Sequence, residues 1–261
     1  MNINKSLKHA LRWSLAPAII LIVGSLFFIV SGRQKTPDEV LAILTKGNQR
    51  FATDQPSYPQ VGPTRRAEVA GGQQPLATII SCSDSRVPPE ILFDAGIGDL
   101  FIVRVIGNIS SGDEVGSAEY GVEHLNTALM VVLGHTSCGA VTAAVNNDDV
   151  HGNIPPVLAN IRPAVLSASL AHPELKGSEL IPEAIKANVF HSMEQLLKRS
   201  ESIRNKALEG KVKVVGAVYD IKSGQIEWLG GHPQQDQLLT YKEAPPVKEA
   251  APARRSVRRK G

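Results

Sequence analysis

The sequence predicts an α/β fold, in which helices flank a mostly parallel central β-sheet with an antiparallel edge. Residues 76–80 and 128–133 form short apolar runs that end in small or polar residues, a pattern typical of buried parallel strands. Near the end of the chain, strand-like residues 211–220 and 226–229 are joined by Ser-Gly, which predicts a hairpin at the sheet edge.

The first 35 residues resemble an export segment. Lys5, Lys8 and Arg12 precede an uncharged run at residues 13–32. A basic flank before an apolar run is typical of a signal peptide or of a single membrane anchor whose N-terminus stays in the cytoplasm. Small residues at 30–32 would allow cleavage, but no Ala-x-Ala site is present, so both readings stay open. Either one places the rest of the chain on the periplasmic or extracytoplasmic side, anchored or soluble.

Residues 36–231 are expected to form one folded domain. Its first helix is predicted at residues 37–51, where Pro37 and two acidic residues occupy the first turn, and residues 54–72 are predicted to form a loop. A strand is expected at residues 100–105. Further helices are expected at residues 111–125, 139–145, 157–170 and 182–207.

Residues 232–261 are rich in Gln, Pro, Ala and Arg, and we expect a basic, disordered tail. The formal net charge of the chain is only +3, and most of the surplus lies at residues 254–260. The charge distribution therefore gives no sign of a basic face, and nucleic-acid binding is not expected.

Polar motifs follow the first and third predicted strands. Residues 81–86 read Ser-Cys-Ser-Asp-Ser-Arg, and residues 134–139 read Gly-His-Thr-Ser-Cys-Gly. The carboxyl ends of parallel strands meet at one edge of a sheet, where ligand sites gather. Cys82, His135 and Cys138 would offer two thiolates and an imidazole, which Zn²⁺ accepts with a fourth position left for water. The alternative for the cysteines is a pair of buried thiols or a disulfide.

Together, Cys-x-Asp-x-Arg followed by His-x-x-Cys resembles the β-class carbonic anhydrases, over about residues 37–229. The resemblance implies a β-carbonic anhydrase fold and a catalytic domain at residues 36–231. It also implies reversible hydration of CO₂ to bicarbonate and a proton by a zinc-bound hydroxide, with Cys82, His135 and Cys138 as ligands. Asp84 would orient the hydroxide and Arg86 would hold Asp84. Without that hold, Asp84 could become the fourth zinc ligand of a closed state.

The same resemblance implies a CO₂ pocket formed by Gln73, Phe101 and Tyr120, partly across the interface of a homodimer or higher oligomer. These residues match the plant-type branch of the family, and Ile79 stands where the other branch has a tryptophan. Two thiolate ligands should acidify the zinc-bound water less than three imidazoles do, so activity should rise toward alkaline pH.

Two other functions are compatible with the sequence. Relatives of this family hydrolyse carbonyl sulfide or carbon disulfide with the same metal site, so the substrate could differ while the fold is kept. Alternatively, the chain could be a non-catalytic exported protein with a Cys82–Cys138 disulfide.

Overall fold

The computed structural model describes residues 34–57 and 60–242. The chain divides into two units, residues 1–36 and 37–261, and nearly all of the described residues belong to the second. Apart from its last residues, the predicted signal peptide or membrane anchor lies outside the described residues.

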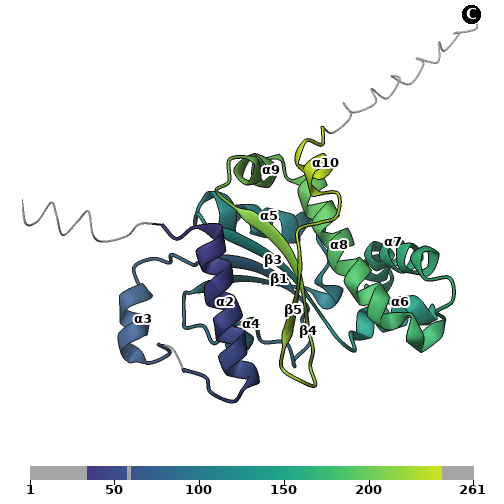
Figure 1. The fold of residues 1–261 in the computed structure, drawn as a ribbon, viewed down its shortest axis with the longest axis horizontal. Helices are drawn as coiled ribbons and strands as arrows, with labels where there is room; N and C mark the ends of the chain where they lie inside the picture. The colour runs from purple at the N-terminus through teal and green to yellow at the C-terminus, as the bar shows by residue number, and fades with distance from the viewer. Residues whose placement is uncertain (1–33, 58–59, 243–261) are drawn as a thin grey trace, which may run out of the picture. The chain divides into compact units, whose positions relative to one another are not determined.

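Five strands form one sheet in the order β2-β1-β3-β4-β5 (Figure 1). The first four strands in that order are parallel, and β5 pairs antiparallel with β4. The strands are β1 (Ala77–Ser81), β2 (Leu100–Arg104), β3 (Leu129–His135), β4 (Lys213–Tyr219) and β5 (Ile226–Gly230). The predicted α/β class with its antiparallel edge is confirmed.

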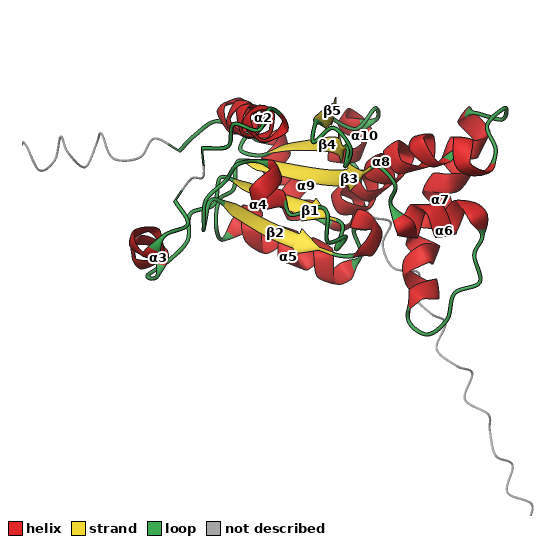
Figure 2. Ribbon diagram, turned by 90° about the horizontal axis from the view of Figure 1, so that it is seen from below, coloured by secondary structure: helices red, strands yellow, loops and turns green. Residues whose placement is uncertain are grey.

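Helices cover both faces of this sheet, with α2 and α4 on one side and α5 and α8 on the other (Figure 2). The α-helices are α2 (Pro37–Ala52), α3 (Pro63–Val69), α4 (Pro89–Leu92), α5 (Gly112–Glu123), α6 (Gly139–Asn146), α7 (Ile154–Ala171), α8 (Ile181–Arg199), α9 (Glu201–Leu208) and α10 (Gln235–Leu239). Two 3₁₀ turns, η1 (Ile106–Asn108) and η2 (Gly177–Glu179), complete the described elements.

The central strands are buried on both faces, which explains why their sequences are continuously apolar rather than alternating. Ile80 and Val132 point into the core beneath α8, whereas Ile79 and Val131 point into the core beneath α2. Gly134, near the end of β3, lets α8 approach closely, because a Cβ at this position would lie 2.7 Å from a methyl carbon of Val189. The end of β3 is thus held firmly between its neighbours.

Three segments differ from the sequence-based expectation. Residues 63–69, predicted as loop, form α3, which Pro63 starts from its first turn. The helix predicted at residues 182–207 is two helices, because Ser200 leaves helical geometry and caps α9 by accepting a hydrogen bond from Ile203 N at 3.2 Å.

The folded unit also extends beyond the predicted boundary at residue 231. Residues 235–239, which were expected to belong to a disordered tail, form α10. Leu238 is only 5% exposed and packs into the core beneath α8. This apolar contact holds the segment, although the average composition of residues 232–261 is typical of disorder. Residues 243–261 lie outside the described residues.

Candidate active site

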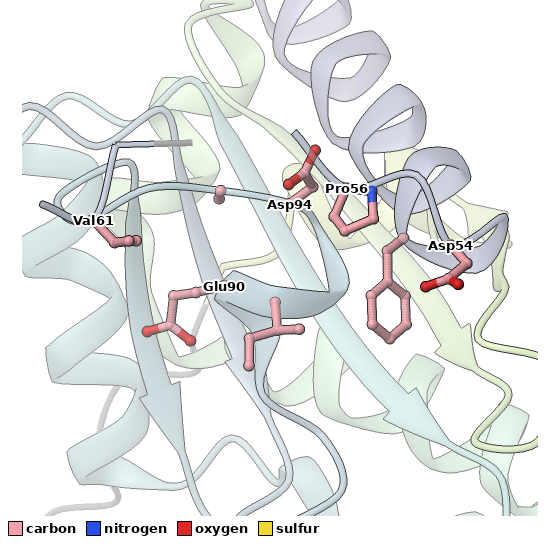
Figure 3. Close-up of a pocket in the computed structure, with 8 residues that line it drawn as sticks. Asp54, Pro56, Val61, Glu90 and Asp94 are labelled. Atoms are coloured by element: carbon pink, nitrogen blue, oxygen red, sulfur yellow. The ribbon is translucent and has the colours of Figure 1, made fainter. Parts of the chain in front are cut away.

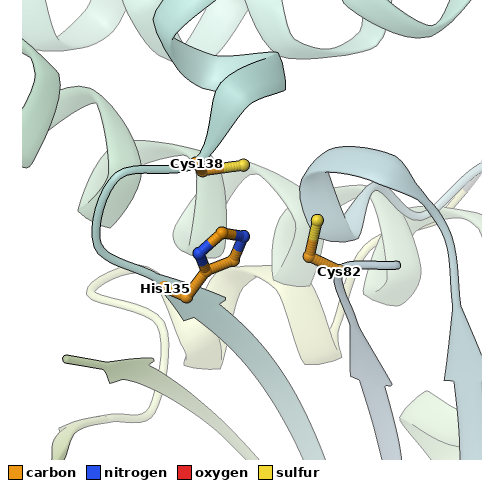
Figure 4. Close-up of side chains that lie close together, drawn as sticks. All are labelled: Cys82, His135 and Cys138. Atoms are coloured by element: carbon orange, nitrogen blue, oxygen red, sulfur yellow. The ribbon is translucent and has the colours of Figure 1, made fainter. Parts of the chain in front are cut away.

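Cys82, His135 and Cys138 come together at the carboxyl edge of the sheet (Figure 4). Cys82 directly follows β1, His135 ends the adjacent parallel strand β3, and Cys138 is the N-cap of α6. Their ligand atoms all lie within 4.8 Å of one another, and all three residues are buried. The order of the strands reverses between β1 and β3, which is where open α/β sheets place their ligand sites.

The backbone beside His135 determines which ring nitrogen carries the proton of the neutral imidazole. Nδ1 lies 2.9 Å from the carbonyl oxygen of Thr136, which can only accept, so Nδ1 carries the proton. Nε2 is left with a free lone pair, is fully buried and has no hydrogen-bond partner among the described residues. A buried acceptor without a partner is costly unless something binds it. Nε2 lies beside the two cysteine sulfur atoms, and a metal cation such as Zn²⁺ fits this set of donors.

The sulfur of Cys82 is surrounded by hydrogen-bond donors. The backbone N–H groups of Gly107 and Asp84 approach it at 3.3 and 3.4 Å. A hydrogen bond from the Cys138 thiol, assisted by these N–H groups, lowers the pKa of Cys82 to about 4, against the effect of burial. The site therefore favours the thiolate that a metal requires.

The pKa of Cys138 is shifted in the opposite direction from that of Cys82. The N–H groups of Ala140 and Val141, at the start of α6, do favour its thiolate, but the neighbouring Cys82 and burial raise the pKa of Cys138. Two thiolates this close repel each other, so without a metal the pair retains one proton. A bound divalent cation would neutralise both sulfurs and remove that repulsion. Both cysteines are free thiols in the structure, which therefore does not contain the alternative Cys82–Cys138 disulfide.

Asp84 and Arg86 form a bidentate pair at the edge of this cluster. Arg86 donates from Nε to Oδ1 at 2.9 Å and from Nη2 to Oδ2 at 2.7 Å, and its backbone N–H adds a bond to Oδ1 at 2.9 Å. The hydrogen bonds from the Arg86 side chain hold the pKa of Asp84 far below its usual range. Oδ2 of Asp84 lies 4.0 Å from Nε2 of His135, so the carboxylate is held beside the cluster.

Further contacts fix the loop that carries this pair. Arg86 Nη2 also donates to the carbonyl oxygen of Ser137, at 3.3 Å, and so links the two motifs. Arg104, at the end of β2, donates to the carbonyl oxygens of Cys82 at 3.1 Å and Asp84 at 2.7 Å. The predicted Asp84–Arg86 contact is therefore present and is braced by a second arginine.

The three residues predicted to line a CO₂ pocket do not reach the cluster within one chain. Phe101 and Tyr120 contact each other, with ring centroids 5.9 Å apart, and Tyr120 is 48% exposed. Phe101 pairs with Thr78, about 13 Å along β1 from Cys82. Gln73 is exposed and precedes β1, toward the opposite end of that strand from the cysteine.

Sequence reasoning assigned no role to Gly107 or Arg104. Gly107 has φ 71° in the turn after β2, and a Cβ there would lie 2.5 Å from Cδ1 of Ile161. A glycine is therefore required for the turn that brings its N–H group to Cys82. The only signal in the sequence was a glycine soon after a strand, which is too common to identify a site.

A cavity of about 390 Å³ lies beside the C-terminal end of α2 and α4 (Figure 3). None of its lining residues belongs to the metal-ligand cluster or to the Asp84–Arg86 pair. They are Phe51, Asp54, Pro56, Val61, Glu90, Ile91, Asp94 and Ala95.

The model of one protein family, described as carbonic anhydrase, matches residues 77–226. "Carbonic anhydrase 2" of Mycobacterium tuberculosis is 37% identical over 186 residues, which cover 70% of this chain and 87% of the relative. A carbonic anhydrase of Mycolicibacterium smegmatis is also 37% identical, over 189 residues that cover 70% of this chain and 89% of the relative.

Solved structures agree with these sequence relatives. A β-carbonic anhydrase of Aspergillus fumigatus superimposes with a TM-score of 0.62 at 28% identity, covering 76% of this chain and 93% of that protein. A β-carbonic anhydrase of Sordaria macrospora, described as tetrameric, gives a TM-score of 0.60 at 26% identity, covering 71% and 94%. The motifs, the sheet order and these relatives together show that the chain belongs to the β-carbonic anhydrase family of enzymes.

Proposed function

We propose that this chain catalyses the zinc-dependent, reversible hydration of CO₂ to bicarbonate and a proton. The observation that carries the proposal is the buried Cys82–His135–Cys138 group, whose imidazole presents an Nε2 that no other described residue hydrogen-bonds. Two thiols and one imidazole make three ligands, and zinc with three protein ligands is the catalytic rather than the structural arrangement.

Zinc, when bound, lowers the pKa of a coordinated water so that the water can attack CO₂ near neutral pH. Asp84 stays ionised beside the cluster and serves as the hydrogen-bond acceptor that orients the attacking water. Arg86 holds the carboxylate in place through two parallel hydrogen bonds, which define its orientation as well as its position.

The substrate pocket is proposed to form between subunits, in the plant-type manner. Gln73, Phe101 and Tyr120 lie away from the cluster of their own chain, and the ring of Tyr120 is half exposed. A neighbouring copy would bring these residues to the cluster, which requires a homodimer or a higher oligomer. An uncharged substrate such as CO₂ suits aromatic walls with one amide donor.

The location of the enzyme is a separate proposal, supported by sequence alone. Lys5, Lys8 and Arg12 precede an uncharged run at residues 13–32, so the catalytic domain is proposed to face the periplasmic or extracytoplasmic side. It would be anchored by this run or released after cleavage.

Purified protein should be assayed for zinc content and for CO₂ hydration by stopped flow, with carbonyl sulfide and carbon disulfide offered in parallel. We expect zinc together with CO₂ hydration. Zinc-loaded protein that hydrolyses only the sulfur compounds would replace the substrate assignment. Zinc-free protein with an intact disulfide after mild purification would overturn the enzyme assignment.

A further inference from the structure

We infer that Thr136 and Asp220 form a clamp that sets the tautomer and the orientation of His135. Neither residue is a metal ligand, and both would act as positioning residues. The inference rests on the proposed function for its catalytic meaning, although the clamp itself is a property of this chain without metal.

Thr136 is the residue that contacts the imidazole. Its carbonyl oxygen accepts the Nδ1 proton of His135 at 2.9 Å, which leaves Nε2 as the nitrogen available to a ligand. Hydrogen bonds to the distal nitrogen of a ligating histidine fix its tautomer and ring orientation. The direction of this one carbonyl group therefore decides how His135 presents Nε2.

The carbonyl sits in a turn that needs support. Ser137, the next residue, has φ 55°, a left-handed conformation that non-glycine residues rarely adopt. Such a conformation persists only where surrounding contacts hold it. The turn also directs the Ser137 carbonyl oxygen toward Arg86, so a relaxed turn would disturb both halves of the site.

The support comes from the hairpin between β4 and β5. The N–H group of Thr136 donates to the carbonyl oxygen of Tyr219 at 2.9 Å. Its hydroxyl donates to Oδ1 of Asp220 at 3.2 Å and accepts the N–H group of Ile221 at 3.1 Å. Three hydrogen bonds from consecutive hairpin residues thus hold one threonine, and only the hydroxyl bonds depend on the side chain.

Asp220 is itself fixed within the hairpin. Its Oδ1 accepts the N–H group of Lys222 at 2.9 Å, and its Oδ2 accepts the hydroxyl of Ser223 at 2.9 Å. These bonds arrange the carboxylate as the cap of a tight turn, with one oxygen shared between the turn and Thr136. The side chain cannot rotate away without breaking all of them.

Helix α2 also holds the hairpin in place. Asn48, a buried residue of α2, donates to the carbonyl oxygen of Gly224 at 2.9 Å and accepts the N–H group of Ile226 at 2.9 Å. A rigid path of hydrogen bonds therefore runs from α2 through the hairpin to Thr136 and the imidazole.

Matched substitutions at Thr136 test the clamp. Thr136→Val keeps the shape of the side chain but removes the hydroxyl, whereas Thr136→Ser keeps the hydroxyl. Asp220→Ala removes the acceptor, whereas Asp220→Asn retains an oxygen for Thr136. Zinc affinity should be measured by chelator competition, and the tautomer of His135 by imidazole ¹⁵N shifts of the metal-free protein.

We expect Thr136→Val and Asp220→Ala to weaken zinc binding by about 10- to 100-fold. The imidazole signal of His135 should shift from a single Nδ1–H tautomer to a mixture. The serine and asparagine variants should stay near the wild type in both measurements. Ile203→Val, which trims a buried side chain of α9 far from the hairpin, controls for a general loss of stability.

The outcomes separate the clamp from the proposed function. Wild-type zinc affinity and an unchanged tautomer in Thr136→Val and Asp220→Ala would overturn the inference while leaving the enzyme assignment intact. The inference would also be overturned if Ile203→Val weakened zinc binding as much as Thr136→Val does while the two variants had the same stability. A wild-type protein that binds no zinc would overturn the proposed function, and the ¹⁵N measurement would still decide the clamp.

Discussion

Replacing Arg86 with alanine should separate zinc binding from catalysis. The variant loses both side-chain hydrogen bonds to Asp84 and keeps only the bond from the backbone N–H group. The guanidinium lowers the pKa of Asp84, so its removal lets that pKa return toward the ordinary value of about 4. The carboxylate then remains ionised at neutral pH, and any loss of activity reports its displacement rather than its protonation.

The expected loss of CO₂ hydration is about 100-fold, the effect of moving a catalytic group by about 1 Å. Loss of an ion pair that merely stabilised a surface turn would cost at most about 1 kcal/mol of stability and leave the rate of the folded protein nearly unchanged. Zinc content should not fall, because Cys82, His135 and Cys138 are unchanged. Asp84 Oδ2 already lies 4.0 Å from Nε2 of His135, so the freed carboxylate could become the fourth zinc ligand in place of water.

The assay is stopped-flow CO₂ hydration with zinc measured on the same samples. Asp84→Asn should also retain zinc and lose activity, and the double variant should lose less than the sum of the two single losses in free energy. Arg65→Ala removes a comparable Arg–Asp pair, to Asp99 at 2.8 Å, outside the site and should change neither quantity. Near-normal activity of zinc-loaded Arg86→Ala or Asp84→Asn would refute the proposed roles of the pair.

Four further outcomes are expected. Elemental analysis of the wild-type protein should find about one zinc per chain, removed by a strong chelator together with the activity, and a clearly lower content would contradict the three-ligand site. Because its pKa is lowered, Asp84 should stay ionised across about pH 6 to 9. Activity should therefore rise toward alkaline pH without an inflection from this residue. If the rise vanished in Asp84→Asn while activity persisted, the titration of Asp84 would be its cause and the prediction would be wrong. A C-terminal reporter that is active only after export should be active, and activity confined to the cytoplasm would show that residues 13–32 do not direct export. If the pocket crosses a subunit interface, mixed oligomers of Gln73→Ala and Asp84→Asn chains should regain roughly a quarter of wild-type activity by random pairing, whereas a pocket within one chain would give no recovery.

The sequence was most informative where local chemistry is strict. The apolar runs predicted the parallel strands, because a strand covered on both faces has no position for a polar side chain. Cys82, His135 and Cys138 could be grouped in advance, because residues that directly follow neighbouring parallel strands must meet at one edge of the sheet. The contact between Asp84 and Arg86 was implied by the resemblance to the family rather than by their spacing.

Other features depended on contacts between segments far apart in the chain. Ser200 divides one predicted helix into two, and α10 is ordered because Leu238 reaches the core, and neither event has a distinctive local pattern. The aromatic pair of Phe101 and Tyr120 could be named from the sequence, but its separation from the cluster within one chain became visible only in three dimensions.

The sequence by itself determined which atoms this protein can offer to a metal and which layer architecture it adopts, since both follow from residue type and spacing. Only the tertiary structure decided how those atoms are held. The tautomer of His135 depends on the direction of the Thr136 carbonyl group, the two thiols that share a proton follow β1 and β3, and the link from Thr136 to Asp220 joins the loops after β3 and β4. The physical reason is that a hydrogen bond depends on distance and direction between groups many residues apart, which spacing along the chain does not specify.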